Sequence, residues 1–404
     1  GYETPYIYTG KKVIPNKTLT NTTANIRLVV LDSVSYYKDS DTAPLAAIIT
    51  DDPNASDVTD LTIEEFNVNI TAYDGKTDTE DAILVLPKTY TDNGAPTRLI
   101  IDCHGFSSDI NGLKTAANAA DGDTYKNLLY FAHQGYAVLA VQGGGRSHDA
   151  VYNLANSGAI NGYVASYEYC LKNYNIAKDV FVKGSSMGGL VSQNLITSGR
   201  VPVLAYVGDS PVTSFYRQLY CESWDNNNIK RVAKMYNFDF SNTGYTYDTF
   251  PFTLQSKQIS DLERQLFIDN FKDKVLPANT IWKYCQFFDN DTKEFKAGFE
   301  DFLTATDPAR VQELYSKIAI DFPVPYLICH ASIDSSVSYN YSKYFVDAIN
   351  RGNGAKAELK TYEVKQSAHC NLGDLTTYPC KDGSQFTAVS SFDEMLKFFR
   401  QYDK

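Results

Sequence analysis

Short apolar segments recur along the chain. Most are followed by a turn rich in Gly, Asp or Ser and then by a helical spacing of apolar positions. Short continuous apolar runs are typical of strands buried on both faces, and their alternation with helices indicates parallel βα units. The pattern therefore predicts a mostly parallel sheet flanked by helices. The expected strands are 99–102, 136–141, 180–182, 203–207, 326–329 and 359–364.

An antiparallel hairpin is predicted before these strands. Two alternating runs, 66–71 and 82–86, flank the sequence Tyr-Asp-Gly-Lys at 73–76. An Asp-Gly pair between alternating runs favours a tight hairpin turn. The sheet is therefore expected to be mixed, with an antiparallel start, and an amphipathic helix at 392–399 is expected near its end.

Two segments do not follow this rhythm. Residues 1–55 hold strand-like pieces at 26–31 and 46–49 among polar turns, and we expect an N-terminal extension on the edge of the sheet. Residues 213–318 are aromatic-rich and favour helices, and an unstructured loop of that length would be unusual. We expect a helical cap inserted into a sheet domain that comprises 56–212 and 319–404. Its expected helices are 215–224, 259–271, 281–288, 295–303 and 311–318.

Composition and charge exclude some classes of binding partner. The 404 residues carry a formal charge of −11 and show no Lys/Arg cluster, which argues against a nucleic-acid surface. No stretch approaches the roughly 20 apolar residues of a membrane span. The chain starts at Gly1, so we expect that a signal peptide or a tag preceded it. With its 30 Tyr and its Asn-x-Ser/Thr runs, it suits a secreted or cell-surface bacterial protein. The oligomeric state stays open.

The seven cysteines do not indicate a metal site. None has the Cys-x-x-Cys spacing of a zinc centre, so neither a metal nor another cofactor is expected. Cys103 and Cys329 lie in apolar runs and are expected to be buried. Cys370 and Cys380 have a spacing that allows a short disulfide loop, and this pairing stays open.

The strongest chemical signal is Gly-Ser-Ser-Met-Gly-Gly at 184–189, which follows a predicted strand and precedes a predicted helix. In that context a Gly-x-Ser-x-Gly turn holds its serine in a strained conformation with Oγ exposed at the sheet edge. Ser186 is therefore the predicted nucleophile. Shifting the motif to Ser185 would lose the flanking glycines, and Ser185 is expected to contact the substrate instead.

A serine hydroxyl needs a base to take its proton. Of the five histidines, His369 has the expected position, on a turn after the last predicted strand and before the terminal helix. An acid must then orient the imidazole. Asp334 leaves the end of the strand 326–329 and is the preferred acid. Asp209, after the strand 203–207, is the rival.

A tetrahedral intermediate needs two backbone N–H donors. Met187 directly follows the nucleophile, and Phe106 follows the turn residue Gly105 after the strand 99–102. Met187 and Phe106 are therefore the expected oxyanion-hole residues, and Gly105 is also expected to contact the substrate. His148, on a loop after three glycines, and Trp224, in the predicted cap, are the remaining candidate substrate contacts.

These motifs, in the order His104-Gly105-Phe106, 184–189, His330 with Asp334, and His369, resemble those of the α/β-hydrolase superfamily. The chain is most similar to secreted esterases and to the prolyl-oligopeptidase-like or dienelactone-hydrolase-like branches. The resemblance covers about 60–404 except for the insertion. One departure is Ala331, where these relatives usually have Gly after the histidine. The resemblance implies hydrolysis of an ester or amide through an acyl-enzyme.

Three functions follow as hypotheses. The first is a serine carboxylic ester hydrolase acting on acetyl or feruloyl-type esters of plant polysaccharide. The second is a serine peptidase of the prolyl-oligopeptidase-like type, which the same residues would serve. The third is a non-catalytic binding protein on a hydrolase scaffold, which the presence of every triad residue disfavours.

Overall fold

The computed structural model describes most of the chain from residue 61 onward and three short segments before it. The described residues are 6–9, 12–15, 36–37, 61–106, 108, 110, 129–148, 153–215, 218, 226–252, 260–276, 284, 288–289, 291–292, 294–298, 305, 307–364, 366–379 and 385–403.

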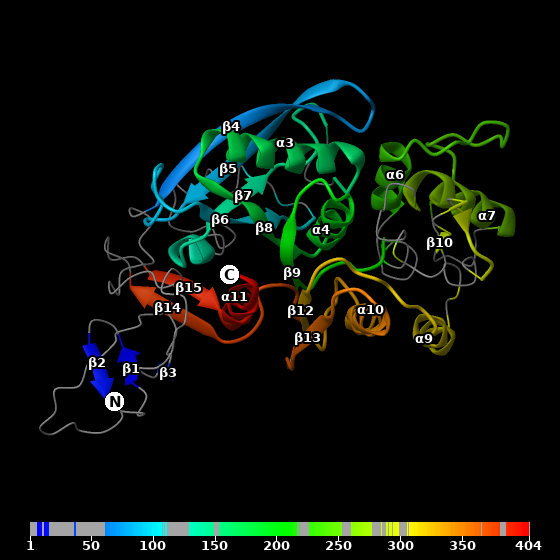
Figure 1. Cartoon of the computed structure of the whole chain (residues 1–404). Coiled ribbons are helices and arrows are strands. Elements are labelled where there is room, and N and C mark those ends of the chain that lie inside the picture. The colour runs from blue at the N-terminus through cyan, green and yellow to red at the C-terminus, as the bar shows by residue number, and fades with distance from the viewer. Residues whose placement is uncertain are drawn as a thin grey trace, which may run out of the picture.

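An eight-stranded sheet forms the centre of the fold (Figure 1). Its spatial order is β13-β12-β9-β8-β6-β7-β5-β4. Neighbouring strands from β7 through β13 pair in parallel, whereas β5 is antiparallel to both β4 and β7. The strands are β4 (Thr62–Thr71), β5 (Thr77–Leu86), β6 (Thr97–Cys103), β7 (Ala137–Val141), β8 (Ile176–Ser185), β9 (Val203–Asp209), β12 (Tyr326–Ala331) and β13 (Ala357–Tyr362).

This topology confirms the predicted fold class. A single antiparallel strand lies second in chain order, and the strand that leads into the Ser186 turn lies in the interior of the sheet. These are features of the α/β-hydrolase fold. The hairpin is also as predicted: β4 and β5 pair over ten positions, from Thr62 with Leu86 to Thr71 with Thr77. Its turn includes Gly75 at φ +81°, a conformation that glycine adopts without steric cost.

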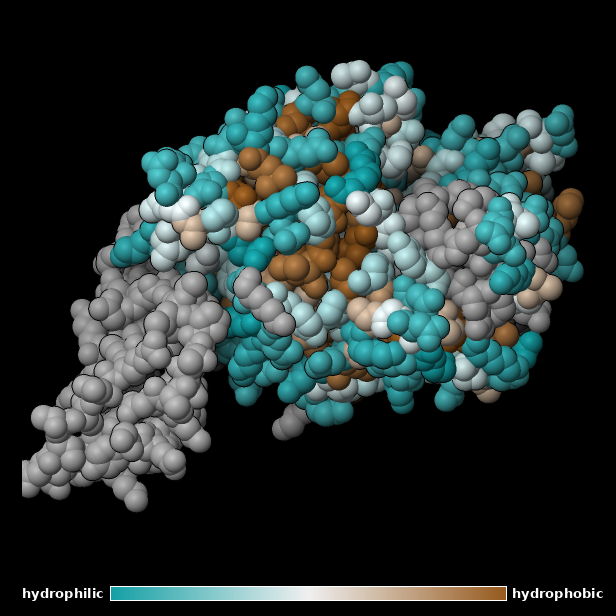
Figure 2. All heavy atoms as spheres, viewed as in Figure 1, coloured by the Kyte–Doolittle hydropathy of each residue, from teal (hydrophilic) through white to brown (hydrophobic). Residues whose placement is uncertain are grey.

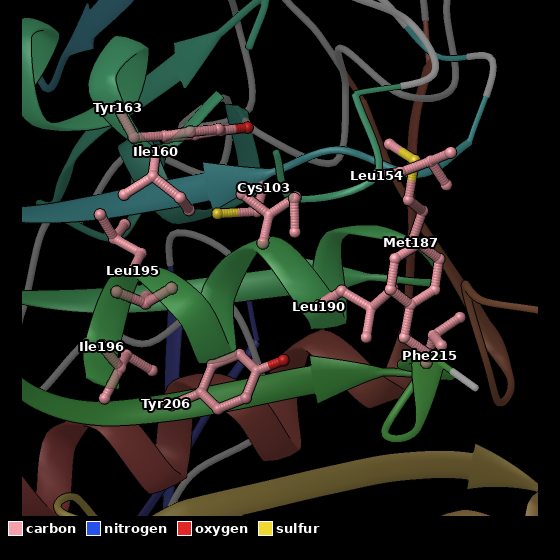
Figure 3. Close-up of a cluster of buried hydrophobic side chains, with 14 of the residues drawn as sticks. Cys103, Leu154, Ile160, Tyr163, Met187, Leu190, Leu195, Ile196, Tyr206 and Phe215 are labelled. Atoms are coloured by element: carbon pink, nitrogen blue, oxygen red, sulfur yellow. The ribbon is translucent and has the colours of Figure 1, made fainter. Parts of the chain in front are cut away.

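The sheet is buried on both faces because successive side chains of a strand point to opposite sides. Ile101 belongs to the core on the side of α3 (Ser157–Asn173) and α4 (Gly188–Thr197). Its neighbour Ile100 packs in the other core, with Phe392 and Phe399 of α11 (Ser390–Tyr402). Figure 3 shows part of the first core, where Leu190 of α4 lies near Met187. The strands are continuously apolar because helices pack on both faces of the sheet.

The predicted strands are present, with changes at their ends. Strand β8 is longer than predicted, because Ile176 already pairs with Thr97. Tyr136 lies outside β7, since its N–H donates to Phe131 O (3.2 Å) in the preceding turn. The predicted strand 359–364 instead covers Ala357–Tyr362. The expected terminal helix 392–399 lies within α11.

The described parts of 213–318 include helices, one short hairpin and a stretch of turns at 236–252. The helices and strands are α6 (Asn226–Met235), α7 (Asp261–Asn270), the π-helix η4 (Phe271–Val275), β10 (Phe288–Asp289), β11 (Glu294–Phe295) and α9 (Pro308–Ser316). The predicted helices 259–271 and 311–318 correspond to α7 and α9. The helical assignment was wrong at Phe288 and Phe295, which pair across the hairpin around an Asp-rich turn.

Further elements lie outside the central sheet. They are β1 (Tyr6–Thr9), β2 (Lys12–Pro15), β3 (Tyr36–Tyr37), α10 (Tyr339–Arg351) and the hairpin of β14 (Leu375–Pro379) with β15 (Gln385–Val389). The strand-like pieces at 26–31 and 46–49, and most of the predicted helix 215–224, lie outside the described residues. The division into an N-terminal extension, a sheet domain and a cap stays a prediction.

The surface in Figure 2 is mostly hydrophilic where it is described, with apolar residues visible mainly near the centre of the view. Among the large apolar side chains of the described part, Leu262 and Ile333 are exposed. No helix in the described ranges combines the length and apolar character needed to cross a membrane.

Candidate active site

The turn between β8 and α4 places Ser186 in the left-handed region, at φ +52°. Such a conformation in a residue other than Gly costs on the order of 1–3 kcal/mol and persists only where its surroundings hold it. Here the Ser186 N–H donates to Asp209 O (3.0 Å), and the Ser186 carbonyl accepts from Gly189 N (2.9 Å) and Val212 N (2.8 Å). The predicted strained turn is therefore present and anchored to the end of β9.

The glycines of the motif allow close packing at this turn. A Cβ on Gly188 would lie 1.9 Å from Cys103 O, and one on Gly189 would lie 2.5 Å from Pro211 Cβ. A Cβ on Gly184 would lie 2.6 Å from Gly188 O. Because real Cβ atoms do not come this close, each of the three positions requires glycine at the present spacing. The motif thus encodes both the turn and its contact with β6.

Ser186 and His369 line one pocket of about 210 Å³ at the carboxyl ends of the parallel strands. The pocket combines the loop after β6, the turn after β8 and the loop that carries His369. Its lining residues are Asp102, His104, Gly105, Phe106, Ser108, Lys183, Ser185, Ser186, His369, Cys370 and Asn371. Five of the predicted site residues therefore meet here: Gly105, Phe106, Ser185, Ser186 and His369.

Asp334 lies behind His369. Its Oδ2 is 2.8 Å from His369 Nδ1, and the Asp334 side chain is fully buried whereas that of His369 is 26% exposed. Asp334 Oδ1 accepts the backbone N–H groups of Ser336 (2.8 Å) and Val337 (2.9 Å). Burial raises the pKa of Asp334, but hydrogen bonds from His330, His369 and Val337 outweigh it and hold that pKa well below its usual range. The carboxyl group is thus kept ionised.

His330 braces the same loop. Its Nδ1 is 2.8 Å from Ser342 Oγ on α10, and its Nε2 lies 3.1 Å from Val337 O and 3.2 Å from Asp334 Oδ2. Both ring nitrogens therefore face groups of the acid loop or the helix that follows it. These contacts give His330 a structural role in holding this loop.

Asp209, the rival acid, contacts the backbone of the His369 loop. Its Oδ2 accepts Asn371 N–H (2.9 Å), and its carbonyl accepts the thiol of Cys370 (3.2 Å). Ser210 Oγ accepts Cys370 N–H (3.1 Å), so Cys370 is a free thiol held by the end of β9. Burial raises the pKa of Asp209, which lies 0% exposed. The end of β9 therefore joins the Ser186 turn to the His369 loop.

The two predicted oxyanion-hole residues are Met187, which follows Ser186 in the chain, and Phe106, on the loop after β6. Met187 is buried and immediately precedes α4, and Phe106 lines the pocket. Gly105, which precedes Phe106, lies close to Ser186, since a Cβ placed on it would be 3.5 Å from Ser186 Cβ. His104 lies between Gly105 O and Gln142 O, each 2.8 Å from a ring nitrogen. Its position agrees with a bracing role in this turn.

The last two predicted contacts lie elsewhere. His148 Nδ1 is 2.9 Å from Asp78 Oδ2 and its Nε2 is 3.5 Å from Asp74 Oδ2, both on the β4–β5 hairpin. His148 is not among the described residues that line the pocket. Trp224 lies outside the described residues.

The glycine run before His148 surrounds a carboxylate. Glu80 of β5 accepts the N–H groups of Gly143 (2.9 Å), Gly144 (2.6 Å) and Gly145 (3.1 Å). The Glu80 side chain is buried, and burial raises its pKa to about 7 although the three N–H groups lower it. These amides therefore bind a carboxylate of the protein itself, and this internal contact explains the glycine run.

An ion pair at the pocket was not anticipated from the sequence. Lys183 Nζ is 2.8 Å from Asp102 Oδ1 and 2.9 Å from Ser185 Oγ. Asp102 and Lys183 are partners in the parallel register of β6 and β8, and both end apolar runs. Two opposite charges at the carboxyl ends of predicted strands are the signal by which this pair could have been found.

Comparisons with known proteins find solved structures that are similar to this chain at low sequence identity. No family model matches the chain, and no curated protein matches its sequence. The rice cell wall degrading esterase LipA from Xanthomonas oryzae is 16% identical, with a TM-score of 0.46 over 76% of this chain and 84% of that one. Est1E from Butyrivibrio proteoclasticus, with ferulic acid bound, is 18% identical, with a TM-score of 0.38 over 73% and 89%.

A puromycin hydrolase is 14% identical, with a TM-score of 0.43 over 81% of this chain and 37% of that one. With identities of 14–18% and TM-scores below 0.5, these likenesses carry no argument about this chain. The fold assignment rests on the strand order and on the turn at Ser186. The resemblance of the chain to the α/β-hydrolase superfamily is therefore a resemblance in fold.

Proposed function

We propose that this chain is a serine carboxylic ester hydrolase with Ser186 as nucleophile, His369 as general base and Asp334 as the acid that orients it. The observation that carries the proposal is the position of His369, which lines the Ser186 pocket and hydrogen-bonds a buried carboxylate through Nδ1. A carboxylate on one ring nitrogen leaves the other free to accept the serine proton.

The reaction follows from these roles. Ser186 Oγ attacks the ester carbonyl while His369 Nε2 takes its proton, and the Asp334 carboxylate stabilises the imidazolium. The N–H groups of Met187 and Phe106 stabilise the negative oxygen of the tetrahedral intermediate. His369 then gives the proton to the departing alcohol, leaving an acyl-enzyme. Water attacks that ester with His369 again as base, which releases the acid and restores Ser186.

The substrate we propose is an acetyl or feruloyl-type ester of plant polysaccharide, hydrolysed outside the cell. The pocket of about 210 Å³ is smaller than the roughly 300–1,000 Å³ typical of ligand sites. It therefore suits a short part of a larger substrate rather than a long acyl chain. The exported location rests on the composition and the Asn-x-Ser/Thr runs of the sequence.

A substrate panel tests this function. Turnover of p-nitrophenyl acetate, methyl ferulate and acetylated xylan would be compared with that of an aminoacyl-proline amide. We expect ester turnover, and a loss of about 10⁶-fold in kcat in Ser186→Ala. Ser198→Ala, at the end of α4 and outside the pocket lining, is the matched control. Amide turnover far above ester turnover would favour the peptidase, and full activity of Ser186→Ala would exclude the mechanism.

A further inference from the structure

The pocket beside Ser186 contains a buried charged group that the proposed mechanism does not use. Asp102, Lys183 and Ser185 line the same pocket as Ser186 and His369. The side chains of Lys183 and Asp102 are only 6% and 8% exposed. Buried ions need additional hydrogen bonds to offset their loss of hydration, so the remaining bonding capacity of this pair is informative.

That capacity is only partly filled by described residues. An ammonium has three N–H donors, and the described bonds of Lys183 go to Asp102 Oδ1 (2.8 Å) and Ser185 Oγ (2.9 Å). These two bonds use two of the three N–H donors of Lys183 and one oxygen of Asp102, so the third donor and the oxygen Oδ2 can bind another group. The Phe392 ring, 5.8 Å from Lys183 Nζ, packs over the ammonium from α11. The remaining donor and acceptor therefore belong to residues that line the substrate pocket.

We propose that Lys183, Asp102 and Ser185 form a subsite that binds a hydroxyl group of the substrate. The proposal rests on the proposed ester hydrolase function and names the chemistry of its substrate. A hydroxyl both donates and accepts, so it can donate to Asp102 and accept from Lys183 at once. A carboxylate or an ammonium there would be attracted by one member of the ion pair and repelled by the other, so it gains little net attraction. The ion pair, whose charges cancel, thus selects an uncharged group that can both donate and accept a hydrogen bond.

The subsite also sets where that hydroxyl lies. Ser185 and Ser186 line the same pocket of about 210 Å³, so a hydroxyl bound there lies near the ester that Ser186 attacks. Such a hydroxyl has two sources: a hydroxyacyl group, or the alcohol part, where a sugar carries a hydroxyl next to the esterified one. The chemistry of recognition is the same for both.

Matched ester pairs separate these sources. Ethyl 3-hydroxybutanoate against ethyl 3-methylbutanoate replaces a hydroxyl by a methyl group on the acyl side. For the alcohol side, 2-hydroxyethyl acetate is compared with propyl acetate. For each pair, the ratio of kcat/KM would be measured in the wild type and in variants, so that intrinsic reactivity cancels between proteins.

The main variant is Asp102→Leu/Lys183→Met, because replacing both members of a buried ion pair by apolar groups is often tolerated. We expect the hydroxyl preference, measured as the ratio of kcat/KM within a pair, to fall about 10- to 100-fold in one of the two pairs. Ser185→Ala retains the ion pair and should lose part of the preference for the hydroxyl ester. This variant replaces the double variant in the test if the double variant does not fold. Arg98→Met/Asp403→Leu, which removes an ion pair outside the pocket lining, should leave the ratios unchanged.

Binding to Ser186→Ala keeps this test independent of catalysis. Calorimetry would compare the two esters of each pair with and without the Asp102→Leu/Lys183→Met changes. Tighter binding of a hydroxyl ester that disappears with the pair supports the subsite even if the wild type hydrolyses no ester. Equal affinities and equal ratios in all proteins would overturn the subsite, while ester turnover lost in Ser186→Ala would still support the proposed function.

Discussion

Asp334 illustrates how the surroundings of one side chain define its chemistry. It accepts two backbone N–H groups on one oxygen and lies within bonding distance of two histidines on the other. These contacts lower its pKa although the carboxyl group is buried. An acid that stays ionised at neutral pH can orient His369 and stabilise its charged form.

Asp334→Asn tests that role. We expect kcat for p-nitrophenyl acetate to fall by about 10⁴-fold, because an amide can hold the imidazole in the wrong tautomer and offers no charge. The measurement is steady-state kinetics at pH 7, with folding checked by circular dichroism. Asp374→Asn, an exposed change near the His369 loop, is the control. A folded Asp334→Asn protein with activity near the wild-type level would assign the acid elsewhere.

The end of β9 connects two elements of the candidate site. Asp209 binds the Ser186 N–H through its carbonyl and the Asn371 N–H through its carboxylate. Ser186, Ser210, Cys370 and Asn371 all have φ between +45° and +56°, so four strained residues meet around this junction. Strain of this kind requires contacts that hold it in place.

Asp209 is therefore expected to be a positioning residue for His369. Asp209→Ala leaves Asn371 N–H without its acceptor and should lower kcat about 10-fold while KM changes less than about twofold, as one lost buried hydrogen bond suggests. Asp209→Asn retains an oxygen acceptor and should recover most of kcat. Kinetics of both variants on p-nitrophenyl acetate would check this. Equal activities for the two variants would argue against the hydrogen bond as the cause.

Glu80 links three parts of the fold. It lies on β5, binds the amides of 143–145 after β7, and approaches α3 so closely that a Cβ on Gly162 would be 2.3 Å from its Oε2. Its pKa is raised from 4.5 to about 7. Between these values the folded state binds more protons than the unfolded state. The free energy of unfolding therefore falls as pH rises through this window.

The Glu80 contribution to that fall is about 3 kcal/mol between pH 4.5 and 8, because a pKa difference of one between the folded and unfolded states corresponds to about 1.4 kcal/mol. Urea denaturation of the wild type and Glu80→Gln at both pH values would measure this contribution. All other groups titrate in both proteins, so the difference between the two pH dependences belongs to Glu80. We expect the wild type to lose about 3 kcal/mol more stability than Glu80→Gln over this range. Glu358→Gln, on an exposed position of β13, should follow the wild type. A parallel pH dependence in Glu80→Gln would contradict the assignment.

The features predicted from sequence are those encoded by neighbouring residues. The apolar runs predict the strands because burial on both faces requires continuous apolar sequence. The Asp-Gly pair predicts the β4–β5 hairpin, and the glycines around Ser186 predict its left-handed turn, because backbone conformation depends on local side chains. His369 is selected from five histidines by its place after the last predicted strand. Its position at the pocket with Ser186 agrees with that choice.

The remaining features depend on which distant residues become neighbours. Asp334 and Asp209 are both acids after strands, and the folded chain alone shows that one faces the His369 ring while the other binds the backbone beside it. Lys183 and Asp102 are separated by 81 residues in sequence and meet through the register of β8 with β6. A buried charge is stable only with a partner, and the sheet register and loop packing select that partner from the many charges in the sequence.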